Sequence, residues 1–140
     1  LTPDGVDCSI EFIPNSEKQV KRCEQLIRQW VGQGNMRLSQ IAILSPHSHP
    51  RSCLHSVQEL AGRKLTLSLD QWRNEKGILF STIRSFKGLE ADAVILTDVP
   101  DLDSIPHFTR NDFYVAVSRA KHLLVVLAKN KAVKSIFTMS

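Results

Sequence analysis

The sequence contains no long apolar run and few cysteines. Its longest apolar stretch extends only from Leu123 to Ala128, whereas a helix that spans a bilayer needs about 20 apolar residues. We therefore expect no membrane-spanning segment. The three cysteines are an odd number at scattered positions. They exclude a disulfide framework and indicate a reducing compartment, so a cytoplasmic protein is expected.

Runs of one charge are absent as well. The formal net charge is +4 and the pI is about 9.2, but lysine and arginine are spread along the chain. This excess is compatible with a polyanionic partner, and a mixed, solvated surface accounts for it equally well. The sequence also lacks a G-x-x-x-x-G-K-[ST] loop, so no segment of it can cradle the β-phosphate of a nucleotide.

What the sequence does contain is an alternation of short apolar segments and amphipathic segments. Strands are predicted at 8–12, 41–44, 65–69, 78–80, 93–96 and 123–127. Helices are predicted at 16–31, from about 50 to 60, at 109–120 and after Asn130. The alternation predicts a parallel α/β layer fold. With 140 residues, 42% of them hydrophobic, the chain suits a single domain over residues 1–140.

Two of the predicted helices carry start signals. Ser16 and Gln19 have the spacing of a capping box. Pro50 suits the first turn of the next helix, because the missing N–H of proline is not needed there. The buried face of that helix would consist of Leu54, Val57 and Leu60.

The segment 113–121 reads Phe-Tyr-Val-Ala-Val-Ser-Arg-Ala-Lys and precedes the last buried strand. Phe113, Val117 and Ala120 fall on the helix face directed at the sheet. Arg119 lies in the last turn, where its guanidinium can donate two hydrogen bonds to a phosphate. As a plain cation at a helix end it would contribute roughly a few tenths of a kcal/mol. From this segment alone, that simpler interpretation is favoured.

The segment 81–90 reads Ser-Thr-Ile-Arg-Ser-Phe-Lys-Gly-Leu-Glu and follows the predicted strand 78–80. Thr82, at the carboxyl end of this strand, together with Arg84 and Ser85, can bind phosphate oxygens. These three side chains are therefore candidates for contacts with a phosphate backbone.

The second half of this segment is also polar. Gly88 allows a ligand to approach the backbone, and Glu90 can accept hydrogen bonds from sugar hydroxyls. The purely structural alternative is a capped turn with a solvated Lys87. Both segments place polar groups at junctions between a strand and a helix, where parallel sheets bind ligands.

Together the two segments resemble motifs V and VI of the UvrD/Rep-type superfamily-one helicases. The segment 45–51, Ser-Pro-His-Ser-His-Pro-Arg after a buried strand, resembles motif IV more loosely. The resemblance covers about residues 7–128 and is strong for 78–128. It implies the C-terminal, second RecA-like domain: a three-layer α/β domain of the P-loop NTPase type. Such a domain has a mostly parallel sheet and lacks its own Walker A loop.

The resemblance also implies roles for individual residues. Arg119 would be the arginine finger that reaches ATP across the domain cleft. The nucleotide-binding residues would be Lys87, Gly88, Glu90 and Arg51. The residues facing the nucleic acid would be Thr82, Arg84, Ser85 and Tyr114. The family usually has a histidine where this chain has Arg84, which suits a phosphate contact but not a role that requires an imidazole.

The implied cofactor is ATP with Mg²⁺, bound jointly with a first RecA-like domain that is normally part of the same polypeptide. The Walker A loop and the acidic residue that holds magnesium are both missing here. We therefore expect the isolated chain to be inactive as an ATPase. Its start at Leu1 indicates a fragment of a larger motor.

The expected partner is single-stranded DNA, with no membrane involved. RNA is an alternative, because phosphate contacts do not report the sugar. Two further hypotheses are a non-catalytic interaction module with the same fold and an unrelated flavodoxin-like domain. No metal site is expected, since the spacing of His47, His49, Cys53 and His55 matches no common zinc pattern.

Overall fold

The computed structural model describes residues 5–100 and 108–131. Within them a sheet has the strand order β1-β7-β6-β2-β5-β4-β3, and every pair is parallel except β3 with β4. The strands are β1 (Asp7–Phe12), β2 (Ile41–Ser45), β3 (Glu59–Leu60), β4 (Arg63–Thr66), β5 (Ile78–Thr82), β6 (Ala91–Val99) and β7 (Ala120–Ala128). The mostly parallel α/β sheet predicted from the sequence is confirmed.

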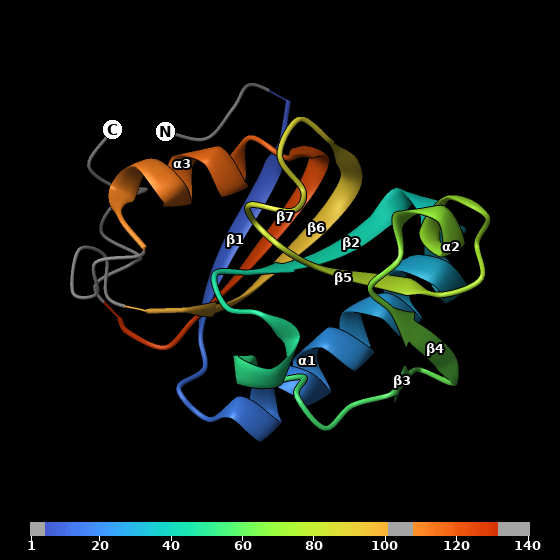
Figure 1. Cartoon of the computed structure of the whole chain (residues 1–140), viewed down its shortest axis with the longest axis horizontal. Coiled ribbons are helices and arrows are strands. Elements are labelled where there is room, and N and C mark those ends of the chain that lie inside the picture. Colours follow the sequence, from blue (N-terminus) through green and yellow to red (C-terminus); the bar gives the residue numbers. More distant parts are fainter. Residues whose placement is uncertain (1–4, 101–107, 132–140) are drawn as a thin grey trace.

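Helices cover both faces of this sheet, which gives three layers (Figure 1). The helices are α1 (Ser16–Arg28), α2 (Leu69–Arg73) and α3 (Arg110–Val117). On one face, α1 packs on strand residues such as Ile43 and Ile95; on the other, α2 and α3 pack on neighbours such as Leu44 and Leu96. Successive strand residues point to opposite faces, so a strand that is apolar throughout must be covered on both sides.

The start of α1 differs from the prediction. Asn15 is the N-cap, and its side chain accepts a hydrogen bond from the N–H of Lys18 at 3.0 Å. Gln19 takes no part in a capping box, because its side chain is buried and its amide donates to the carbonyl of Ile13 at 2.8 Å. The helix then passes into a π-helical turn at Gln29–Gln33, close to the predicted end of the helix at residue 31.

The helix predicted to begin at Pro50 is wrong. The chain forms only a 3₁₀ turn at His49–Arg51, followed by irregular turns. The N–H of Cys53 bonds to the carboxylate of Asp98 and is therefore not available to a helical carbonyl. Leu54 is buried as predicted, but Leu60 is buried as part of β3.

The strand predicted over 65–69 is correct only at its start. β4 ends at Thr66, and Ser68 caps α2 by accepting a hydrogen bond from the N–H of Gln71. Leu67 is consequently 63% exposed. The helix predicted after Asn130 falls mostly on residues 132–140, outside the described residues. Within the described ranges, no helix is long and apolar enough to cross a membrane.

The three cysteine thiols are held in their protonated form by the fold. Burial, and then the Asp98 carboxylate, raise the pKa of Cys53 to about 12. Burial, and then Asp7, raise the pKa of Cys8 to about 11. The pKa of the fully buried Cys23 is also raised, mainly by burial. Because only the thiolate reacts, the folded protein should resist alkylation at neutral pH.

We predict that iodoacetamide at pH 8 alkylates Cys53 on the order of a thousandfold more slowly in the folded protein than in urea, and Cys8 on the order of a hundredfold more slowly. Site-resolved mass spectrometry measures both rates. A thiol whose pKa is raised in the folded state contributes its full stabilisation at a pH below the unfolded-state pKa. This stabilisation is lost as the pH rises from the unfolded-state pKa to the folded-state pKa. The urea concentration at the midpoint of unfolding should therefore decrease as the pH is raised from 8 to 10. Equal labelling rates with and without urea would contradict the prediction.

Candidate functional site

Thr82 ends β5 and lies between two hollows of about 220 Å³ each at the carboxyl edge of the sheet. The first is lined by Pro46, Thr82, Ile83, Arg84, Phe108 and Asp112. The second is lined by Ser48, His49, Pro50, Leu67, Phe80, Ser81, Thr82 and Ser85. The chain that follows β2 therefore borders Thr82 on both sides. This is the edge at which parallel sheets bind ligands.

The turn that follows Thr82 has a defined geometry. The Thr82 hydroxyl accepts a hydrogen bond from the N–H of Ser85 at 3.0 Å and lies 2.9 Å from the Ser85 hydroxyl. The N–H of Ile83 donates to the carbonyl of Ser45 at 3.1 Å. Ile83 is buried while Arg84 and Ser85 are exposed. The structure therefore groups Thr82, Arg84 and Ser85, the three residues predicted from motif V to contact nucleic acid.

Segment 83–90 then crosses the face of the sheet to the start of β6. Phe86 is fully buried and makes a T-shaped contact with Trp72, with ring centroids 5.7 Å apart. Lys87, Gly88 and Glu90 beyond it are exposed. Burial of Phe86 thus holds the segment on the sheet and leaves its polar residues accessible.

Arg119 meets the end of this segment. Its Nη1 donates to the carbonyl of Leu89 at 3.4 Å, and its Nη2 donates to the hydroxyl of Ser118 at 2.9 Å. Its own carbonyl accepts a hydrogen bond from the N–H of Ala91 at 3.0 Å. The two segments singled out in the sequence therefore lie side by side, at the end of α3 and the start of β6 (Figure 1).

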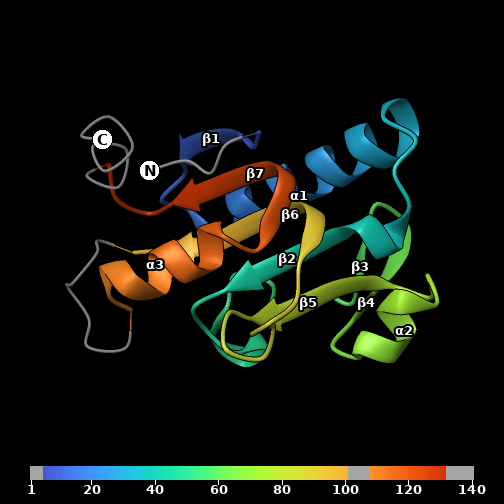
Figure 2. The same cartoon turned by 90° about the horizontal axis from the view of Figure 1, so that it is seen from above.

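The predicted residues form two groups at opposite edges of the sheet, which corrects the expectation that both segments lie at the ligand-binding edge. Thr82 is at the carboxyl end of β5, but Glu90 and Arg119 precede β6 and β7 and lie at their amino ends. The reason is that a parallel strand must start at the edge opposite to the one where its predecessor ended. Figure 2 shows β5, β6 and β7 running in the same direction.

Two predicted residues lie apart from their expected groups. Arg51 is exposed in the 3₁₀ turn whose neighbours border the hollow beside Thr82. Among the described residues, no contact joins it to Glu90 or Arg119. Tyr114 is 38% exposed on α3, and its ring contacts Phe113. The nucleotide role of Arg51 and the nucleic-acid role of Tyr114 remain predictions.

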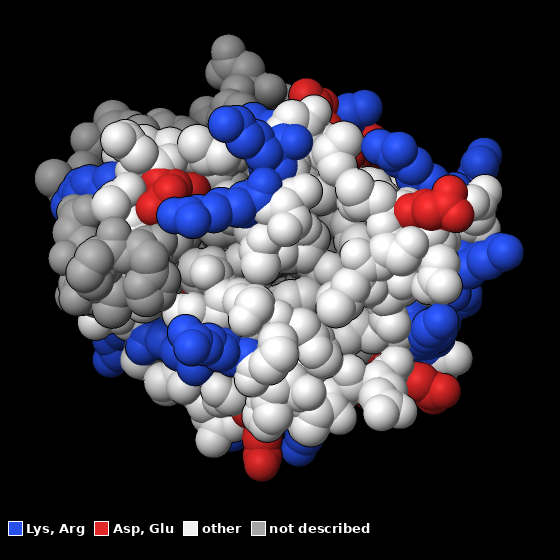
Figure 3. All heavy atoms as spheres, in the orientation of Figure 1, with Lys and Arg blue, Asp and Glu red and all other residues white. Residues whose placement is uncertain are grey.

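Basic side chains do not form one continuous patch on the face that Figure 3 shows. Lysine and arginine gather in separate groups around an uncharged centre. A partner bound here would therefore be recognised by particular side chains rather than by a broad positive field. Over residues 5–100 and 108–131, no cluster of three or more His, Cys, Asp or Glu is placed to hold a metal ion.

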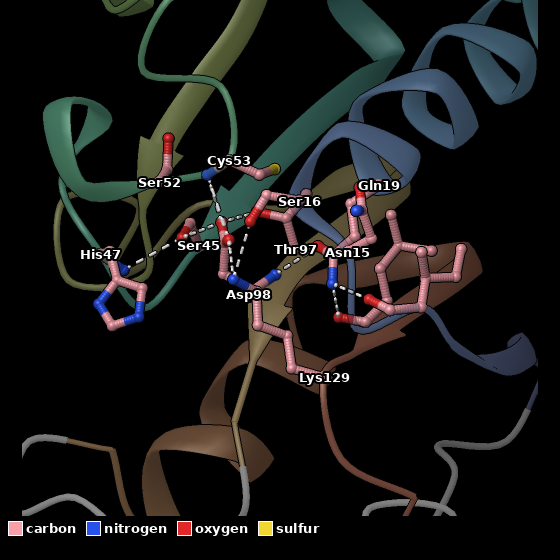
Figure 4. A network of polar contacts seen from close by, with 12 residues as sticks. Asn15, Ser16, Gln19, Ser45, His47, Ser52, Cys53, Thr97, Asp98 and Lys129 are labelled. Atoms are coloured by element: carbon pink, nitrogen blue, oxygen red, sulfur yellow. Dashed lines mark hydrogen bonds and ion pairs between the residues drawn. The ribbon is translucent and has the colours of Figure 1, made fainter.

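Sequence reasoning did not identify Asp98 as a candidate residue. Asp98 is 2% exposed and accepts hydrogen bonds from side chains and main chain of several segments (Figure 4). The available signal was its position, since Thr97 and Asp98 directly continue the apolar run 93–96. A charge that continues a buried strand is expected to be paired.

Comparison with known families agrees with this geometry. Residues 77–127 match the family model of the UvrD-like helicase C-terminal domain. The resemblance to the C-terminal domain of UvrD/Rep-type helicases is confirmed. The match runs from the start of β5 to β7 and includes both segments that meet at Arg119. It supports a helicase motor domain. No curated protein matches the chain.

Gly88 has a conformational role that the sequence alone did not indicate. Its φ is +81°, in the left-handed region that residues with a Cβ avoid, and no heavy atom lies within 4 Å of the position a Cβ would take. Gly32 also has open space around it, but its φ is not in that region. The two glycines are therefore a matched pair that differs in backbone conformation.

We predict that Gly88→Ala lowers the free energy of unfolding by about 1 to 2 kcal/mol, because alanine is strained in the left-handed region. Gly32→Ala should leave it unchanged or raise it, since alanine is favoured over glycine in a helical segment. Urea denaturation of both variants and the wild type measures the difference. Equal stability of the two variants would show that Gly88 adopts another conformation.

Proposed function

We propose that this chain is the C-terminal motor domain of an ATP-dependent DNA helicase or translocase. It would supply the arginine finger and part of the track for single-stranded DNA. The observation that carries the proposal is the contact of Arg119 with Leu89, which brings motif VI against the Lys-Gly-Leu-Glu step of motif V. The family match over residues 77–127 supports it.

Arg119 suits an anionic ligand. Among the described residues, its guanidinium bonds to main-chain carbonyls and to a hydroxyl, and no carboxylate forms an ion pair with it. Its positive charge is therefore available to stabilise charge on a phosphate. Lys87, Gly88 and Glu90 are exposed next to it and are the groups we assign to the nucleotide.

The cofactor we propose is ATP with Mg²⁺, whose phosphoanhydride bond would supply the free energy for movement along the strand. This chain offers Arg119 and Glu90 toward it but contains no Walker A loop. We therefore propose that a first RecA-like domain holds the other side of the nucleotide, and the 140-residue chain by itself should not hydrolyse ATP.

The group around Thr82 suits a phosphodiester backbone. Hydroxyls of Thr82 and Ser85 and the exposed guanidinium of Arg84 lie together on the turn that follows β5. Hydroxyl and guanidinium donors are the groups that bind backbone phosphates without reading bases. We assign these residues to the DNA strand. The separation of the two groups at opposite edges suits a motor in which ATP and DNA occupy different sites.

We predict that Arg119→Ala, in the protein joined to its first RecA-like domain, lowers the DNA-stimulated ATPase kcat on the order of 10³-fold, because a guanidinium no longer stabilises the transferring phosphate. Affinity for single-stranded DNA should change little, since Arg119 lies at the opposite edge from Thr82. Steady-state ATPase assays and fluorescence anisotropy with an oligothymidylate measure the two effects. Arg28→Ala, on the helix that covers the other face, is the control. Near-normal turnover of Arg119→Ala would reduce Arg119 to a structural cation.

We predict that Arg84→Ala weakens binding to single-stranded DNA and lowers the slope of log K against log salt by about 0.7, because one fewer phosphate of the single strand is neutralised. The ATPase kcat at saturating DNA should stay close to that of the wild type. A salt series of anisotropy titrations measures the slope, with Arg28→Ala again as the control. An unchanged slope would remove Thr82, Arg84 and Ser85 from the DNA track, whereas the nucleotide assignment of Arg119 would stand.

A further inference from the structure

Asp98 combines two unfavourable features in one residue. Its side chain carries a charge in a position that is 2% exposed, and its φ is +59°, in the left-handed region. Burying a charge is costly unless it is paired and hydrogen-bonded, and a residue with a Cβ is strained in this backbone conformation. Such a residue persists only where its surroundings determine its conformation.

The carboxylate of Asp98 accepts hydrogen bonds from three neighbours. The hydroxyl of Ser45 donates at 3.2 Å, the hydroxyl of Thr97 at 2.9 Å, and the N–H of Cys53 lies 3.1 Å from both carboxylate oxygens. Lys129 forms an ion pair with it at 3.7 Å. Figure 4 shows these groups converging on one carboxylate from β2, the chain after it, β6 and the end of β7.

The left-handed backbone of Asp98 is held from the other side. Its N–H donates to Oε1 of Gln19 at 2.9 Å, and the amide of Gln19 donates in turn to the carbonyl of Ile13. Gln19 is fully buried on α1. The helix therefore fixes the orientation in which the Asp98 carboxylate points toward β2.

Asp98 holds both ends of one loop. Ser45 precedes the loop and Cys53 follows it, and both bond to the same carboxylate. Between them, Pro46 lines the first hollow beside Thr82, and Ser48, His49 and Pro50 line the second. The carbonyl of Ser45 also accepts a hydrogen bond from the N–H of Ile83, and this bond fixes the exit of the chain from β5.

We propose that Asp98 is a positioning residue for DNA binding: by holding loop 46–52 at both ends, it keeps in place the wall of the two hollows beside Thr82. This proposal rests on the assignment of Thr82, Arg84 and Ser85 to the single strand. Asp98 itself is buried behind the loop and need not touch the DNA.

The test is Asp98→Asn in the protein joined to its first RecA-like domain. The amide has nearly the shape of the carboxylate, but it is uncharged. In either orientation its NH₂ group would face the N–H of Cys53 as a second donor, because that N–H lies 3.1 Å from both carboxylate oxygens. If the loop is then ordered in only a third to a tenth of the molecules, the affinity for an oligothymidylate falls by about three- to tenfold. The ATPase kcat at saturating DNA should stay near the wild-type value, while the DNA concentration for half-maximal activity rises by the same factor.

A general loss of stability would not produce this separation, and Ile27→Val is the control for it. Ile27 is fully buried on α1 and belongs to the core on the face of the sheet opposite α2 and α3. Removing one buried methylene group costs about 1 kcal/mol of stability. This variant should destabilise the protein without weakening DNA binding at a temperature where both variants are folded, as checked by circular dichroism.

Hydrogen exchange gives a second readout. In Asp98→Asn, peptides covering 46–53 should exchange faster than in the wild type, whereas peptides covering α3 should not. Ser45→Ala removes one donor to Asp98 and serves if Asp98→Asn does not fold. It should weaken DNA binding in the same direction, and in a double-mutant cycle its effect and that of Asp98→Asn should be less than additive.

The outcomes separate this proposal from the proposed function. Suppose that Arg84→Ala flattens the salt slope but Asp98→Asn binds DNA like the wild type. The positioning role is then wrong and the DNA track stands. If Asp98→Asn does not fold, Ser45→Ala takes its place in this comparison. If Ile27→Val weakens binding as much as Asp98→Asn, the effect is general destabilisation and the proposal is again overturned. If Arg84→Ala has no effect, the DNA track itself is wrong.

Discussion

A parallel sheet obliges the chain to cross from the carboxyl edge to the amino edge between one strand and the next. Between β5 and β6, segment 83–90 makes this crossing, and Phe86 anchors it on the sheet against Trp72. Thr82 and Arg84 therefore stay at one edge, while Glu90 reaches the other and meets Arg119. A single connection thus contributes to both groups of predicted ligand-binding residues, and the geometry of the sheet keeps them apart.

The polar residues on this connection are not explained by packing. Arg84, Lys87 and Glu90 are exposed, whereas the contacts that hold the segment come from Ile83 and Phe86. Residues that a fold does not need for burial are better candidates for binding than residues in its core. Gly88 is the exception in the segment, since its left-handed backbone gives it a structural role independent of any ligand.

Asp98 organises the carboxyl edge in a different way. A buried carboxylate contributes little net stability, because desolvation offsets much of the attraction to its partners. Its hydrogen bonds are directional, however, and they hold Ser45, Cys53 and Thr97 in fixed relative positions. The same bonds explain why no helix forms after Pro50: the N–H of Cys53 is bonded to Asp98 instead of continuing a helix. The periodicity of Leu54, Val57 and Leu60 predicted a helix because it reports burial without revealing this competing acceptor.

The sequence by itself determined the strands β2, β5, β6 and β7, because a short run that is apolar at every position can only be covered on both faces of a sheet. It also indicated the resemblance to the UvrD-like helicase C-terminal domain, because each motif is contiguous in the chain, and the family match over residues 77–127 supports it. Only the tertiary structure decided that the two motifs meet at Arg119 and Leu89, that the predicted residues divide between opposite edges, and that Asp98 bonds to both ends of loop 46–52. These features depend on groups that are distant in sequence, such as Gln19 and Asp98, and local patterns of polarity carry no information about which distant group will accept a hydrogen bond.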